Sequence, residues 1–120
     1  MRVAGLGFRR AASLAALADA LAAALERAGP ADALATSRAK ADAPVILALA
    51  RARGLPLIAV DVAGTATPTQ SPRVTALHGT GSLAEAAALA ALGPGARITV
   101  TRVTSADGMA TAAIAQGDPA

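Results

Sequence analysis

The sequence predicts a single three-layer α/β/α domain with a mainly parallel (mixed) sheet and a C-terminal antiparallel hairpin. Two observations predict this class: stretches typical of strands and of helices alternate along the chain, and 120 residues suit one domain. No internal repeat or long linker divides the sequence. We therefore expect residues 1–116 to form the domain and residues 117–120 to be a disordered tail.

An apolar stretch at residues 2–6 predicts the first strand. The helix after it begins near Ser13 and ends at Gly29-Pro30, a pair that stops helices. Its leucines recur at helical spacing and form one apolar face: Leu14, Leu17, Leu21 and Leu25. A short strand is expected next, at residues 33–36.

The second helix is expected to begin at Asp42, whose carboxylate can cap it, with Pro44 in its first turn. Arg51 and Arg53 suit its negative C-terminal end, and Gly54 closes it. Residues 57–62 form an apolar run of the kind found in buried parallel strands.

Residues 64–72 are rich in Thr, Pro and Gly, which predicts a loop, and residues 74–77 predict a short strand. Ser82 and Glu85 have the spacing of a capping box, so a third helix should begin here. Gly93-Pro94 ends that helix.

Two further strands are expected at residues 97–104 and 109–115. The turn signal Asp107-Gly108 between them predicts that they pair as a hairpin on one edge of the sheet.

The composition excludes several kinds of site. The sequence has no Cys, and His78 is its one His, so we expect no disulfide, thiol nucleophile or metal site, and no cofactor. Phe8 is the one aromatic residue, which leaves no stacking platform for nucleic-acid bases. The net charge of +3, from ten Arg and one Lys against eight acids, favours small anionic ligands without requiring nucleic acid.

We expect a cytoplasmic protein with no membrane association. No apolar stretch reaches the ~20 residues that span a bilayer. Arg9-Arg10 and the Ala/Leu run after it resemble an export signal, but Asp19 and Glu26 interrupt the run.

The polar groups of the chain converge in the predicted fold. Loops that leave parallel strands emerge at one edge of a sheet, where ligands bind, and three helix N-termini there favour anions. These loops should carry one clear acid, Asp61, and a set of basic residues: Arg9, Arg10, Arg38, Lys40, Arg73 and His78. The sequence therefore predicts a basic, glycine-rich edge, with no such concentration at the opposite ends of the helices.

Each feature also has a simpler interpretation. Gly5 and Gly7 fit a tight turn, and a dinucleotide fingerprint fails because Arg10 occupies its third glycine position. Further alternatives are solvated charges at Arg9 and Arg10, a Lys40–Asp42 pair, a plain cap at Ser82 and Glu85, and a half-buried imidazole at His78. No two carboxylates have an obvious acid/base spacing.

At these loops the sequence resembles the C-terminal domain of the cobalamin-biosynthesis protein CbiG, a domain that stands alone as CobE. Five stretches carry the resemblance, in family order: residues 5–11, 35–50, 54–57, 79–89 and 111–115. The most specific are the stretch around Lys40 and Gly79-Thr-Gly-Ser-Leu-Ala-Glu-Ala-Ala-Ala. The family commonly has Cys where this chain has Phe8, which argues against a thiol role, and Glu where it has Asp42.

The resemblance implies a cobalamin-biosynthesis protein that binds an anionic corrin-ring (precorrin) intermediate as a carrier or auxiliary factor, with other enzymes of the pathway as possible partners. It implies ligand-binding positions at Gly5, Gly7, Arg9, Arg10, Lys40, Gly79, Gly81 and Ser82. One alternative is an enzyme that opens a lactone on a precorrin, as cobalt-precorrin-5A hydrolase does, with His78, Lys40 or Glu85 as acid or base. Another is a generic phosphate- or nucleotide-binding domain.

Overall fold

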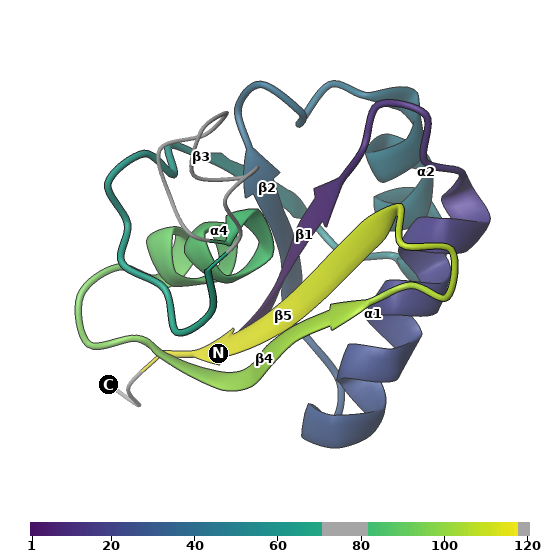
Figure 1. The fold of residues 1–120 in the computed structure, drawn as a ribbon. Coiled ribbons are helices and arrows are strands. Elements are labelled where there is room, and N and C mark those ends of the chain that lie inside the picture. The colour runs from purple at the N-terminus through teal and green to yellow at the C-terminus, as the bar shows by residue number, and fades with distance from the viewer. Residues whose placement is uncertain (71–81, 118–120) are drawn as a thin grey trace.

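The computed structural model describes residues 1–70 and 82–117 of the chain. With the labels of Figure 1, the helices and strands follow the order β1 (Arg2–Phe8), α1 (Leu14–Ala28), β2 (Ala33–Ser37), α2 (Pro44–Arg53), β3 (Leu57–Val60), α4 (Leu83–Leu92), β4 (Arg97–Thr104) and β5 (Ala110–Gln116). The strand predicted at residues 74–77 lies outside the described residues.

The strands form one mixed sheet in the order β3-β2-β1-β5-β4. β1, β2 and β3 are parallel, whereas β5 is antiparallel to both β1 and β4. Figure 1 shows α1 and α2 on one side of the sheet and α4 on the other. The predicted fold class, three layers with a C-terminal antiparallel hairpin at the sheet edge, is therefore confirmed.

Two apolar cores lie on the two faces of the sheet. One packs α1 and α2 against residues such as Leu6, Leu34 and Ile114, and the other packs α4 against β1, β2 and β3. In α1, Leu17 and Leu21 of the predicted apolar face are buried, but Leu14, in the first turn of the helix, is 41% exposed. The helix begins next to Ser13, near its predicted start, and Ser13 caps it, because its hydroxyl accepts a hydrogen bond from the Ala16 N–H at 3.1 Å.

The first strand extends to Phe8, two residues beyond its predicted end. Gly5 and Gly7 therefore lie within β1 and not in a turn, and both face α4. A Cβ atom on Gly5 would lie 1.9 Å from the Ala84 carbonyl oxygen. The glycine is needed here because helix and strand backbones touch, a reason that spacing along the sequence does not reveal.

The predicted cap of α2 is wrong. The helix begins at Pro44, its N-cap is Ala43, and no side chain caps it. The proline explains the difference: the residue before a proline is driven into extended conformation, and Ala43 has φ −63° and ψ 134°. Asp42 thus lies one residue outside the helix. Gly54 closes the helix in left-handed conformation, as expected.

The third parallel strand is shorter and less buried than predicted. β3 spans Leu57–Val60 and lies at the edge of the sheet, so three of its four residues are only half-buried. An apolar run shows that a strand has covered faces, but not which strands flank it.

Ser82 begins α4 and Gly93 ends it, as predicted. The hairpin strands also appear where expected, with Gly108 in left-handed conformation in the turn. Within residues 1–70 and 82–117, none of the helices combines the length and hydrophobicity needed to cross a bilayer.

Candidate ligand-binding site

The carboxyl ends of β1, β2 and β3 meet at one edge of the sheet, which we call the rim. The β4–β5 turn lies at the same edge, because β5 is antiparallel to β1 and Ala110 pairs with Phe8. The Arg9 N–H donates a hydrogen bond to the Met109 carbonyl oxygen at 2.9 Å, which joins this turn to the loop after β1. The predicted convergence of strand ends therefore holds for the described residues. The β4–β5 turn also lies at the rim, which the sequence analysis did not predict.

A hollow of about 520 Å³ opens at the rim on the α1/α2 face, between the loops that follow β1 and β2. Its volume is within the range of small-molecule sites. Three of its lining residues carry charge, and the others are apolar: Arg10, Lys40 and Asp42, with Phe8, Ala12, Ala39, Ala43, Pro44 and Val45. Charged groups around apolar walls suit a ligand that is itself partly apolar and partly ionic.

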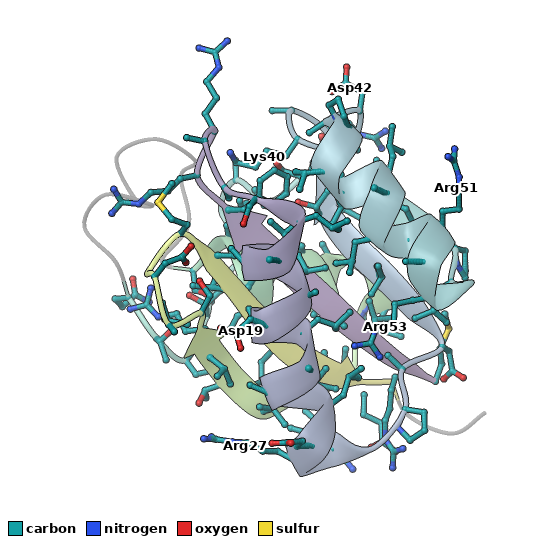
Figure 2. The ribbon with its side chains drawn as sticks, turned by 90° about the vertical axis from the view of Figure 1, so that its right-hand side faces the viewer. Asp19, Arg27, Lys40, Asp42, Arg51 and Arg53 are labelled. Atoms are coloured by element: carbon teal, nitrogen blue, oxygen red, sulfur yellow. The ribbon has the colours of Figure 1, made fainter. Side chains whose placement is uncertain are left out.

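Lys40 is the best-fixed cation of the hollow. Its Nζ lies 4.9 Å from the centroid of the Phe8 ring, within the range of a cation–π contact. Turns hold its backbone, because its N–H donates to Ser37 O at 3.0 Å and its carbonyl accepts from Ala43 N–H at 3.1 Å. Figure 2 shows Lys40 and Asp42 at the end of the molecule where α2 begins.

The other predicted cations are less constrained. Arg9 and Arg10 are both exposed, and only Arg10 lines the hollow. Arg38 forms an ion pair with Asp61 at 3.0 Å, with 66% and 84% of the two side chains exposed. Such an exposed pair contributes little stability, but it partly neutralises Arg38.

On the α4 face of the rim, the described residues pack closely against one another. Ser82 is buried and its hydroxyl accepts a hydrogen bond from the Glu85 N–H at 3.4 Å, which confirms the predicted cap. The first turn of α4 lies against Gly7, since a Cβ atom there would be 3.3 Å from Leu83 Cβ. Ser82 therefore shares an edge of the sheet with Arg10 and Lys40, but on the opposite face. Arg73, His78, Gly79 and Gly81, predicted for this edge, lie outside the described residues.

Glu85 does not complete the predicted capping box. Its carboxylate is fully buried, and Oε1 accepts hydrogen bonds from the Thr69 N–H and hydroxyl at 2.9 and 2.8 Å. Oε2 accepts from the Arg102 N–H at 2.9 Å. The carboxylate thus ties the segment after β3 and strand β4 to α4, and this geometry favours a structural role over acid/base catalysis.

The β4–β5 turn brings an acid to the rim that sequence analysis overlooked. Asp107 Oδ1 accepts from the Ser105 hydroxyl at 2.7 Å and from the Met109 N–H at 3.0 Å. The hydrogen bond from Ser105, followed by that from Met109, lowers the pKa of the Asp107 carboxyl below its usual value of 3.8. A second acid, Asp19 of α1, accepts from the Ala106 N–H at 2.9 Å and anchors the turn to that helix.

Among the described residues, the rim is not the more basic edge of the molecule; two members of the predicted basic set, Arg73 and His78, lie outside these residues. Four cations at the rim (Arg9, Arg10, Arg38, Lys40) face three acids (Asp42, Asp61, Asp107). The opposite edge has five cations (Arg2, Arg27, Arg51, Arg53, Arg97) and two acids (Glu26, Asp32). Helix ends explain part of this difference, because Arg27, Arg51 and Arg53 occupy last turns, where cations are favoured. The described part of the rim therefore holds a hollow but no surplus of positive charge over the opposite edge.

The family described as "Cobalamin synthesis G C-terminus" matches residues 2–115. The chain belongs to this family. It is therefore a member of a cobalamin-biosynthesis family, as the resemblance of its loops indicated. No curated protein matches the sequence.

Two solved structures from the cobalamin pathway are similar to this chain. One is CobE, a protein from the cobalamin (vitamin B12) biosynthetic pathway, with a TM-score of 0.80 and 29% identity over 96% of this chain and 89% of that chain. The other is cobalamin biosynthesis protein chiG from Agrobacterium tumefaciens str. C58, with a TM-score of 0.73 and 32% identity over 99% of this chain and 100% of that chain. Both comparisons cover nearly the whole of each chain.

Proposed function

We propose that this protein binds an anionic corrin-ring intermediate at the hollow and serves cobalamin biosynthesis as a carrier or auxiliary factor. The observation that carries the proposal is the hollow itself, where Arg10 and Lys40 flank apolar walls at the carboxyl edge of the sheet. Membership of the family indicates the cobalamin pathway. The charge and shape of the hollow support a ligand that is both anionic and partly apolar. We place this activity in the cytoplasm, with other enzymes of the pathway as partners.

The chemistry of corrin intermediates suits these side chains. Their acetate and propionate groups project from a large, partly apolar ring, so one ligand offers both ionic and apolar contacts. Arg10 can bind a carboxylate through two parallel hydrogen bonds, and Lys40 offers an ammonium group. Because the hollow opens to solvent at the rim, a ring larger than its volume can extend beyond it, with only some of its carboxylates bound.

The test is a titration of the purified protein with a stable corrin whose side chains are free carboxylates, followed by its visible absorption band. We expect saturable binding in the micromolar range, since each charge-assisted hydrogen bond contributes about 1.5–3 kcal/mol before association costs. The same ring with its carboxylates converted to neutral amides is the matched ligand control. Absence of any spectral change at tens of micromolar would contradict the proposal.

Substitutions localise the site. Arg10→Ala and Lys40→Met should each weaken binding of the polycarboxylate by roughly tenfold or more, because each removes a charge-assisted contact. Arg51→Ala is the control, since this arginine is also exposed but lies in the last turn of α2 at the opposite edge. Equal affinity of all three variants and the parent protein would move the site away from the hollow.

A further inference from the structure

Two adjacent hydroxyl groups at the carboxyl end of β2 differ in their hydrogen bonding. Both side chains are buried, since Thr36 is 0% exposed and Ser37 is 5% exposed. The Thr36 hydroxyl donates a hydrogen bond to the Leu6 carbonyl oxygen at 2.8 Å. Within residues 1–70 and 82–117, Ser37 Oγ is the one buried side-chain nitrogen or oxygen atom without a hydrogen-bond partner. An unpaired hydroxyl in a protein interior destabilises the fold, so a binding role is a physical reason for it to be there.

Strand geometry directs the Ser37 side chain towards α4. Side chains alternate between the two faces of a strand, and Ala35, two residues before Ser37, belongs to the core that packs against α4. Ala35 pairs with Gly5 in the parallel register of β1 and β2, so Gly7 lies beside Ser37. A Cβ atom on Gly7 would be 3.5 Å from the Ala84 nitrogen, in the first turn of α4. Because neighbouring strands are about 4.8 Å apart, the Ser37 hydroxyl lies about one strand spacing from the start of this helix.

The start of α4 has hydrogen-bond donors that the helix does not use. The first N–H groups of an α-helix have no acceptor within it. The first intrahelical hydrogen bond runs from the Ala86 N–H to the Ser82 carbonyl oxygen at 2.9 Å, and the Ser82 hydroxyl accepts from the Glu85 N–H. Between these positions, the N–H groups of Leu83 and Ala84 make no hydrogen bond with any residue that the structure describes.

We propose that the Ser37 hydroxyl and the N–H groups of Leu83 and Ala84 form a binding subsite for one oxyanion, a carboxylate or phosphate group, on the α4 face of the rim. All three groups are donors, and the positive end of this ten-residue helix adds to their preference for negative charge. The oxyanion supplies the partner that the Ser37 hydroxyl lacks within the protein. The subsite lies on the opposite face of the sheet from the hollow, so it goes beyond the proposed function and does not depend on it.

The acids near this subsite are engaged elsewhere. Glu85 is in the first turn of α4, but its carboxylate accepts from the Arg102 N–H of β4, and β1 and β5 separate β4 from β2. Asp61 follows the β3 residue that pairs with Ser37, and its carboxylate forms an ion pair with Arg38 at 3.0 Å. This pair adds little net charge, so the helix start decides the sign of the ligand.

The first measurement needs no ligand and compares the two adjacent hydroxyls in a buffer without phosphate or carboxylate. Ser37→Ala should raise the melting temperature by roughly 2–5 °C, because it removes a buried hydroxyl that has no partner. Thr36→Val is the matched control and should lower the melting temperature, because it removes a buried hydroxyl that has one. An unchanged or lower melting temperature for Ser37→Ala would show that the protein satisfies this hydroxyl and would overturn the inference.

The second measurement is a titration of the full chain with inorganic phosphate, followed by the backbone amide resonances of Leu83 and Ala84 in NMR spectra. Both resonances should shift in a saturable manner, whereas sodium chloride at equal ionic strength should not shift them. Ser37→Ala should weaken the affinity roughly fivefold or more, because the anion loses a hydrogen bond, and Thr36→Val should bind phosphate as the parent protein does. An unchanged affinity in Ser37→Ala would overturn the inference.

The same titration with the corrin polycarboxylate identifies the source of the oxyanion. If a carboxylate of a ligand in the hollow reaches the subsite, Arg10→Ala will weaken the effect of the corrin on the Leu83 and Ala84 resonances but not that of phosphate. If phosphate alone shifts them, the subsite takes a free anion. Phosphate binding at the subsite by a protein that binds no corrin would support this inference and contradict the proposed function. Corrin binding that Arg10→Ala weakens, with no shift of these amides by either probe, would do the reverse.

Discussion

The two faces of the sheet use the same edge in opposite ways. On the α1/α2 face the loops after β1 and β2 stay apart and leave a hollow with charged walls. On the α4 face the helix presses against β1, and Gly5, Gly7, Ser82 and Glu85 are all buried in contacts within the protein. Glycine and serine in a motif can therefore serve packing, whereas Arg10 and Lys40 line the hollow that the described residues form.

The strongest test of this comparison is Gly5→Ala. The added methyl group would meet the Ala84 backbone oxygen, which cannot rotate away, so helix and strand must separate. We expect a loss of about 3 kcal/mol or more in the free energy of unfolding, measured by urea denaturation. Gly7→Ala is the graded control: its closest contact, at 2.9 Å, is the side-chain hydroxyl of Thr111, and it should cost about 1 kcal/mol. Equal losses in the two variants would show that close helix packing does not explain the glycines.

The next largest effect is expected at Glu85. Glu85→Ala removes the acceptor of three hydrogen bonds and leaves two backbone N–H groups and a hydroxyl without it, at a cost of about 3 kcal/mol. The melting temperature should fall by roughly 10 °C. Glu26→Ala, which removes an exposed acid from α1, should change it little. If Glu85→Ala has the same melting temperature as the parent protein, a structural role is contradicted and Glu85 becomes a catalytic candidate again.

The third prediction concerns Asp42, which lines the hollow and lies just before α2. Because Ala43 and not Asp42 caps α2, Asp42→Ala should change stability by less than about 0.5 kcal/mol, whereas loss of a true cap costs about 1 kcal/mol. The same variant should bind the corrin polycarboxylate roughly twofold to threefold more tightly, because it removes a like charge from the hollow. Weaker binding would mean that Asp42 contacts the ligand directly.

The smallest effect concerns pH. The pKa of Asp107 is lowered in the folded protein, so its ionised form stabilises the fold above its unfolded pKa. That contribution is lost as the pH falls from about 4 through the lower folded value. Asp107→Asn keeps an acceptor oxygen but cannot titrate, so the melting temperatures of parent and variant should converge as the pH falls below this range. Parallel curves from pH 7 to pH 2 would contradict the assignment.

The helices and strands were predicted well because caps, turns and apolar periodicity each depend on residues that are close together in the sequence. The leucines of α1, the cap at Ser82 and the turn at Asp107-Gly108 each specify structure within a few positions. The cap and the turn are confirmed, and the apolar face of α1 is buried at Leu17 and Leu21 but not at Leu14. The cap of α2 could also have been predicted correctly, since Pro44 restricts Ala43 whatever the fold.

The site was harder to predict because its members are distant in sequence. Phe8 and Lys40 are brought together by the parallel pairing of β1 and β2, and Glu85 meets Thr69 and Arg102 at separations of 16 and 17 residues. Sequence analysis assigned the loops to one edge, which holds for their described residues, but it did not separate the two faces of that edge. The half-burial of β3 depends on its place at the edge of the sheet, and an apolar run does not encode that place.

The hydrogen bond between the Arg102 N–H and the Glu85 carboxylate has a consequence for how copies of this protein meet. In the described sheet β4 is an edge strand, whose backbone groups form a template onto which another chain can add. The Glu85 side chain of α4 accepts a hydrogen bond from one of these backbone donors, the Arg102 N–H. Two irregularities of register, between Ile98 and Val100 and between Val100 and Val103, interrupt the pairing of β4 with β5. Both features disfavour the pairing of β4 with an edge strand of another copy of the protein.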